Sequence, residues 1–146
     1  MNPYYEKQIE EARKYQDFVK HELYRRGIPL VFNDSKHYQY AEGENILGAE
    51  IKNDKMFRDT GNLYIEIAEK TEASNKDYVK SGIYRDDNSW LYTIGDYKTI
   101  YIFGVKHLII VHSKGKYREV TKDTSIGFLY PVEDAASIAL RVINIQ

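Results

Sequence analysis

The chain has 146 residues, a length typical of one domain with its own hydrophobic core, and we expect a single domain over residues 1–146. It has no cysteine, which excludes disulfides and thiolate metal sites and favours a reducing, cytoplasmic compartment; its apolar runs are too short to cross a membrane. A formal net charge of −1 excludes the strongly basic field of many nucleic-acid-binding domains.

The N-terminal segment predicts a long amphipathic helix over residues 3–26. Its apolar residues recur at helical spacing and are Ile9, Ala12, Val19 and Leu23. We expect this stripe to be buried against a sheet. Gly27 and Pro29 supply a stop signal, and short strands are predicted at residues 30–32 and 37–40.

Two segments in the middle of the chain alternate between apolar and polar residues, the pattern of strands with one buried face. In residues 45–54 the polar side carries Glu50, Lys52 and Asp54. In residues 62–70 it carries Tyr64, Glu66, Ala68 and Lys70. We expect the two segments to form a hairpin with a shared polar face.

The remaining segments complete an α/β (α+β) pattern. Strands are predicted at residues 90–94 and 99–103, and residues 105–112 suit either a helix or a strand. A strand at 127–130 and a helix at 133–143 close the chain. This order predicts a central mixed β-sheet flanked by the long N-terminal helix and the C-terminal helix.

The polar face of the predicted hairpin carries the candidate chemistry. Glu50 and Lys52 are two apart on a strand, so their side chains leave the same face about 7 Å apart. Asp54 follows on that face, and Glu66 reaches it from the partner strand. Carboxylates that hold Mg²⁺ beside a lysine that orients water are what phosphodiester hydrolysis requires. The competing interpretation is a solvated face with cross-strand ion pairs.

The same residues resemble a known family. The run Gly43 to Lys52 resembles the acid followed by D/E-x-K of PD-(D/E)xK, restriction-endonuclease-like nucleases, and its short spacing is similar to that of mismatch-repair strand-nicking endonucleases. The motifs that continue the resemblance, to small phage-type and bacterial members, are Lys52-Asn53-Asp54, Thr60-Gly61-Asn62, Ile65-Glu66, Ser81-Gly82-Ile83 and the strand near Trp90.

This resemblance implies a restriction-endonuclease-like core and roles for particular residues. Glu44 would be the first acid, Glu50 the second acidic ligand and Lys52 the catalytic lysine. The first acid is Glu rather than the expected Asp, and Glu42 or Asp54 are alternatives for it.

A second assignment takes Glu50 or Asp54 as the first acid and Glu66 as the second. Ala68 then stands where a lysine is expected, so Lys52 or Lys70 would substitute. Across both assignments the catalytic candidates are Glu50, Lys52 and Glu66, and the candidate metal ligands are Glu44, Glu50, Asp54 and Glu66. Family members often add a glutamate from the first helix, for which Glu11 and Glu22 are candidates.

The sequence therefore leads to two functional hypotheses. The first is an endonuclease that uses Mg²⁺ or Mn²⁺ to cut DNA, with homodimerisation expected if both strands are cut. The second is a non-catalytic nucleic-acid-binding or assembly module on a nuclease-like fold. The near-neutral charge favours the second hypothesis, and the ordered motifs favour the first.

Overall fold

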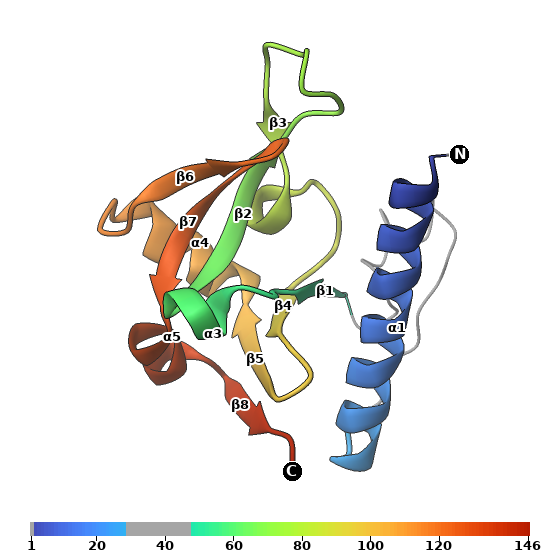
Figure 1. Ribbon diagram of the computed structural model, residues 1–146. Coiled ribbons are helices and arrows are strands. Elements are labelled where there is room, and N and C mark those ends of the chain that lie inside the picture. The colour runs from blue at the N-terminus through green and yellow to red at the C-terminus, as the bar shows by residue number, and fades with distance from the viewer. Residues whose placement is uncertain (1, 29–47) are drawn as a thin grey trace.

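The computed structural model describes residues 2–28 and 48–146 (Figure 1). The strands predicted at 30–32 and 37–40, and the candidate acids Glu42 and Glu44, lie outside these residues. The helical elements are α1 (Pro3–Arg25), α3 (Phe57–Thr60), the 3₁₀ turn η1 (Gly82–Tyr84), α4 (Val105–Ser113) and α5 (Val132–Ile138). The strands are β1 (Ala49–Asn53), β2 (Asn62–Glu69), β3 (Val79–Lys80), β4 (Leu91–Gly95), β5 (Thr99–Gly104), β6 (Glu119–Lys122), β7 (Ser125–Pro131) and β8 (Arg141–Asn144).

The described strands form two four-stranded sheets, so the α/β class is confirmed but the single central sheet is not. The first sheet has the order β1-β4-β5-β8 and is mixed, because β1 runs parallel to β4 while the other neighbours are antiparallel. The second sheet has the order β3-β2-β7-β6 and is antiparallel throughout.

The expected hairpin between the two alternating segments is wrong. β1 pairs with β4 in the first sheet, and β2 pairs with β7 and β3 in the second. The physical reason is the turn between them, where the chain bends at Asp54 and forms the single helical turn α3 before entering β2. Gly61 ends this turn in the left-handed conformation, at φ 77°.

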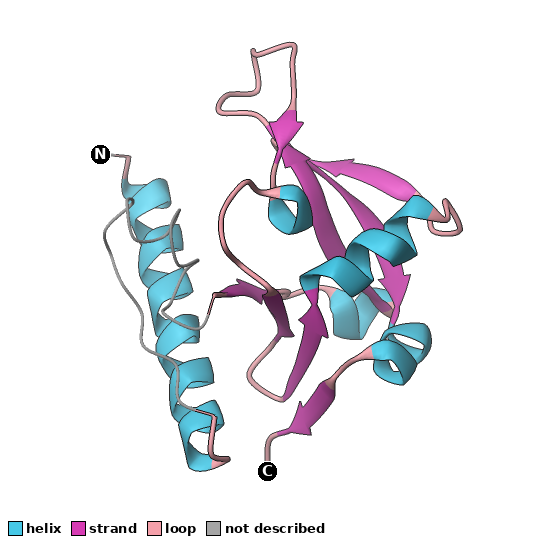
Figure 2. Ribbon diagram, turned by 180° about the vertical axis from the view of Figure 1, so that it is seen from behind, coloured by secondary structure: helices cyan, strands magenta, loops and turns pink. Residues whose placement is uncertain are grey.

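Helix α1 covers one face of the first sheet, as Figures 1 and 2 show. Asn2 caps its N-terminus by accepting a hydrogen bond from the backbone N–H of Tyr4. Val19 and Leu23 are buried as predicted, whereas Ile9 is only half-buried and Ala12 is exposed. The stripe continues instead through Tyr15, and its partners on the sheet are Ile51, Ile100, Ile102 and Ile143.

The opposite face of the first sheet meets the second sheet in the larger core. Because side chains alternate along a strand, Tyr92, Ile94, Tyr101 and Phe103 point away from α1 into this core. Strand β2 contributes Leu63 and Ile65, both fully buried. Glu50 and Lys52 lie on this inner face of β1, opposite Tyr92 and Ile94 in the parallel register.

Two further expectations are settled by the C-terminal half. The undecided segment at 105–112 is the helix α4, and Figure 2 shows it lying across the second sheet. The helix expected at 133–143 is wrong in extent, because α5 ends at Ile138 and the chain continues as β8 along β5. Val142 and Ile143 pack against opposite cores there, which a strand permits.

No described helix is long and apolar enough to cross a membrane.

Candidate functional site

The centre of the candidate site is a buried ion pair on β1. Glu50 is 1% exposed, and the Nζ of Lys52 lies 3.1 Å from its Oε1. Apart from this ion pair, neither carboxylate oxygen of Glu50 has a hydrogen-bond partner among the described residues. Buried carboxylates normally accept several hydrogen bonds, so Glu50 has acceptor capacity that the described protein leaves unused.

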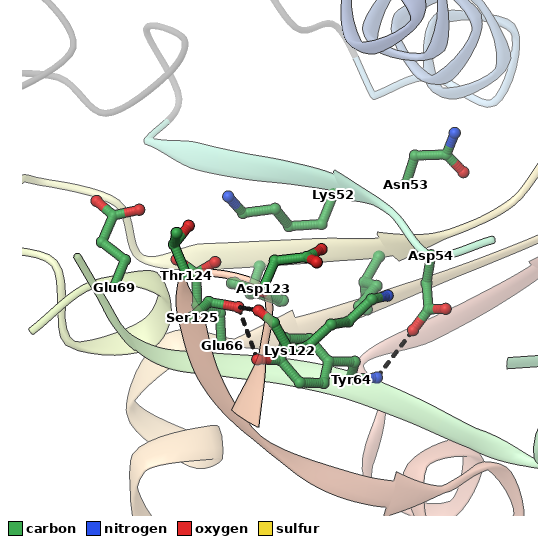
Figure 3. Close-up of a pocket in the computed structure, with 12 residues that line it drawn as sticks. Lys52, Asn53, Asp54, Tyr64, Glu66, Glu69, Lys122, Asp123, Thr124 and Ser125 are labelled. Carbon is green, nitrogen blue, oxygen red and sulfur yellow. Dashed lines mark hydrogen bonds between the residues drawn. The ribbon is translucent and has the colours of Figure 1, made fainter. Parts of the chain in front are cut away.

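Lys52 also lines a cavity of about 280 Å³ between the edge of the first sheet and the second sheet (Figure 3). Side chains from β1, β2, β4 and the β6–β7 turn surround it, and they include Lys52, Asp54, Glu66, Tyr92, Lys122 and Ser125. Four acidic side chains and two lysines line the cavity, so its walls carry an excess of negative charge. A cation would relieve this excess.

Glu66 is held at the cavity by the segment that follows β3. The Ser81 hydroxyl donates a hydrogen bond of 2.8 Å to Glu66 Oε2. Gly82 lies against the backbone of Glu66 so closely that a Cβ there would stand 2.0 Å from the Glu66 carbonyl oxygen, and its φ of 58° also favours glycine. The Ser81-Gly82 pair therefore fixes both the carboxylate and the backbone of Glu66.

Asp54 lies at the end of β1 and is engaged by the backbone. Its Oδ1 accepts hydrogen bonds from the N–H groups of Met56 and Phe57, and its Oδ2 accepts one from Tyr64, at 2.8 to 3.1 Å. These three bonds hold the turn into α3 and join it to β2. Asp54 lines the cavity, but most of its acceptor capacity is already used, which argues against it as a principal metal ligand.

Tyr92 forms part of the cavity wall directly opposite Glu50 on the neighbouring strand. It is fully buried, and its hydroxyl has no hydrogen bond of normal geometry within the described residues. Burial raises the pKa of this phenol, and the carboxylates of Glu50 and Glu66 raise it further. Lys52 and the nearby backbone of Glu66 lower it, but the net direction is upward. The hydroxyl therefore keeps its proton at neutral pH.

The structure brings some of the predicted residues together and separates others. Lys52, Asp54 and Glu66 line one cavity, and Glu50 contacts it through Lys52. Lys70 points elsewhere, because its ammonium donates to the Asn75 carbonyl. Within the residues that the structure describes, no group of three or more acidic, histidine or cysteine side chains is arranged to hold a metal ion.

The helix-one candidates are engaged in ion pairs, that of Glu11 at the surface and those of the buried Glu22 at the end of α1. Glu11 pairs with Lys55, whose hydrogen bond and charge lower the pKa of the glutamate. Glu22 pairs with Arg26 and, at longer range, Arg25 near the end of α1. Neither glutamate lines the cavity between the sheets.

No role was assigned from the sequence to two polar features. Ser81, from the Ser81-Gly82-Ile83 motif, joins the site through its contact with Glu66, and Tyr92 joins it through the β1–β4 pairing; residue spacing indicates neither contact. A chain of hydrogen bonds also links Tyr84, His112 and Glu119, three residues of η1, α4 and β6. These hydrogen bonds join the three elements over the second sheet. None of the three residues lines the cavity between the sheets.

Comparison with protein-family models, with curated proteins and with solved structures gives no match for this chain.

Proposed function

We propose that this chain is a metal-dependent endonuclease that hydrolyses phosphodiester bonds in DNA at the cavity beside Glu50 and Lys52. The observation that carries the proposal is the Glu50 carboxylate, which is buried and has unused acceptor capacity next to an acidic cavity. A buried carboxylate whose partner is a single ammonium is incompletely compensated, and a divalent cation would stabilise it.

The donor set suits Mg²⁺ or Mn²⁺ better than softer metals. Glu66 lines the cavity and Glu50 lies beside it against Lys52, so both supply carboxylate oxygens, and the chain has no cysteine thiolate. Mg²⁺ commonly binds through one or two carboxylates together with waters and substrate phosphates, so a set of two acids is compatible with it. Asp54 would contribute at most its remaining lone pair. Glu44, from outside the described residues, stays in the proposal as a further acid.

The bound metal would polarise the phosphate and lower the pKa of an attacking water. The residues of the chain have separate tasks around this chemistry. The Lys52 ammonium, held by Glu50, orients the water and offsets the negative charge that grows on the phosphate oxygens as the P–O bond breaks. Ser81 keeps the Glu66 carboxylate turned into the cavity. The inner wall formed by Tyr92 and Ile94 limits the water around the reacting groups.

The test separates metal binding from turnover. Lys52→Ala should retain Mg²⁺ or Mn²⁺ binding and lose turnover by a factor on the order of 10² or more, because the lysine acts mainly in the transition state. Cleavage of duplex, single-stranded and branched DNA is measured, with calorimetry for metal binding. Lys98→Ala, at an exposed turn away from the cavity, is the matched control and should cut normally. Wild-type protein that binds no divalent ion, or a Lys52 variant with full activity, overturns the proposal.

A non-catalytic binding module is the second candidate. It is favoured by the near-neutral charge and by the lack of a three-ligand metal cluster among the described residues. Under this reading the cavity binds nucleic acid without divalent ions and no DNA in the panel is cut. DNA binding measured in the presence of a chelator distinguishes the two functions. Binding that persists supports the binding module. Binding that is lost supports the nuclease, because a cavity with excess negative charge should repel DNA unless a cation is present.

A further inference from the structure

We propose that the buried hydroxyl of Tyr92 donates a hydrogen bond to the phosphodiester in the cavity, which makes Tyr92 a further catalytic residue. This inference rests on the proposed nuclease function and adds a substrate contact to it. The first ground is position: Tyr92 faces the cavity and is the direct cross-strand neighbour of Glu50.

The second ground is that the Tyr92 hydroxyl makes no hydrogen bond of good geometry within the described residues, although the backbone of Glu66 lies near it. Its side chain packs in the larger core beside phenylalanines such as Phe103, which fill the same kind of space without a polar atom. Tyrosine hydroxyls in a core normally find a partner. Tyr117, for comparison, donates to Asp134 Oδ2 at 2.8 Å. A buried hydroxyl without a well-placed partner, on a residue that lines a cavity, is therefore best explained by an acceptor that arrives with the ligand.

The third ground is the chemistry of the neighbours. The Tyr92 phenol is a hydrogen-bond donor that pairs in register with Glu50 and lines the same cavity as Glu66. Lys52 supplies a second donor on the same inner face of the sheet. An ammonium and a phenol placed together match a phosphate, whose non-bridging oxygens accept hydrogen bonds and gain charge during hydrolysis.

Tyr92→Phe tests the assignment because it removes only the hydroxyl. In the metal-free protein the variant should melt no lower than wild type, since no partner is left unsatisfied. Its metal affinity should be unchanged, and its kcat should fall by about tenfold to a hundredfold with a smaller effect on KM. Tyr117→Phe is the matched control and should show the reverse, a lower melting temperature with normal kcat, because its hydroxyl is paired outside the cavity.

The outcomes separate this inference from the function on which it rests. If wild type cuts DNA and Tyr92→Phe cuts equally fast, the inference is overturned and the nuclease proposal stands. A melting temperature lowered as much as in Tyr117→Phe also overturns it, because the hydroxyl would then have a structural partner. If wild type neither binds metal nor cuts DNA, the nuclease proposal fails and this inference fails with it.

Discussion

Glu50 and Asp54 are two buried carboxylates on the same strand segment, four residues apart, and the protein treats them differently. Asp54 accepts three hydrogen bonds from backbone N–H groups. Glu50 is less exposed, at 1% against 7%, yet within the described residues its partner is the single ammonium of Lys52. Both positions look alike in the sequence, where each is an acid on the polar side of an alternating strand.

The difference in hydrogen-bond partners indicates which buried carboxylate stabilises the fold and which one could bind a ligand. A carboxylate whose lone pairs are occupied by backbone donors stabilises the turn that holds them, as Asp54 does between β1 and β2. A buried carboxylate with free lone pairs weakens the fold and persists when a ligand or reaction uses it. On this argument we propose that Glu50 serves the site and Asp54 the scaffold.

The largest expected effect is on activity, from Glu50→Gln. This change removes the charge with little change of shape, so metal binding should be lost and kcat/KM should fall by a factor on the order of 10³ or more. The melting temperature should stay the same or rise, because an incompletely paired buried charge is removed. Activity, calorimetry and thermal melting check this, with the exposed Glu10→Gln as control. A marked drop in melting temperature would show that Glu50 is structural.

The next effect is on stability, from Asp54→Ala. Three backbone donors lose a charged acceptor, and the free energy of unfolding should fall by about 3 kcal/mol or more. Metal affinity of the folded fraction should change little, since the acceptor capacity of Asp54 is mostly used by the backbone. Urea unfolding measures the loss, and the exposed Asp59→Ala nearby should change stability by less than about 0.5 kcal/mol. Loss of metal binding at full stability would reverse the assignment of Asp54.

The sequence predicted elements better than their pairing. Val19 and Leu23 mark the buried side of α1 at helical spacing, and β1 and β2 alternate as strands do. Nothing local specifies that β1 pairs with β4 across two intervening strands, β2 and β3, and the helical turns α3 and η1, because register and partner depend on long-range packing. The irregularity between Glu66 and Ala68, where the register with β7 shifts, is also invisible in the alternation.

The candidate site likewise has residues that the sequence could indicate and contacts that it could not. Glu50, Lys52 and Glu66 could be selected because they share the polar side of two alternating strands and lie in the motifs of the resemblance. Ser81 belongs to those motifs too, but its contact with Glu66 could not be predicted, nor could the place of Tyr92. They arise from the approach of η1 to β2 and from the parallel neighbour of β1. Part of the motif set has a structural explanation: Gly82 permits close contact with Glu66, and Gly61 ends α3 with a positive φ.

The smallest predicted effect concerns Asp96, which combines the two kinds of partner that distinguish Glu50 from Asp54. Its carboxylate accepts backbone N–H groups of Lys98 and Thr99 and pairs with Arg58. Burial raises the pKa of Asp96, but the Arg58 guanidinium and the two N–H groups lower it more, so the folded pKa lies below the ordinary value. The contribution to stability is therefore present above pH ~4 and is lost as the pH falls through the folded pKa.

Asp96→Asn keeps an acceptor for the backbone and removes the charge, so it isolates the ionic partner. At pH 7 it should reduce the free energy of unfolding by about 1 kcal/mol, a modest value because Arg58 is 42% exposed and water screens the pair. The difference from wild type should shrink as the pH falls from about 5 toward 3, because wild-type Asp96 then becomes neutral as well. Urea unfolding at pH 7, 5 and 3 measures it, with the exposed Asp86→Asn as control. A difference that grows on acidification would mean that Asp96 is not stabilised as the anion, and the distinction drawn between Glu50 and Asp54 from their partners would lose its support.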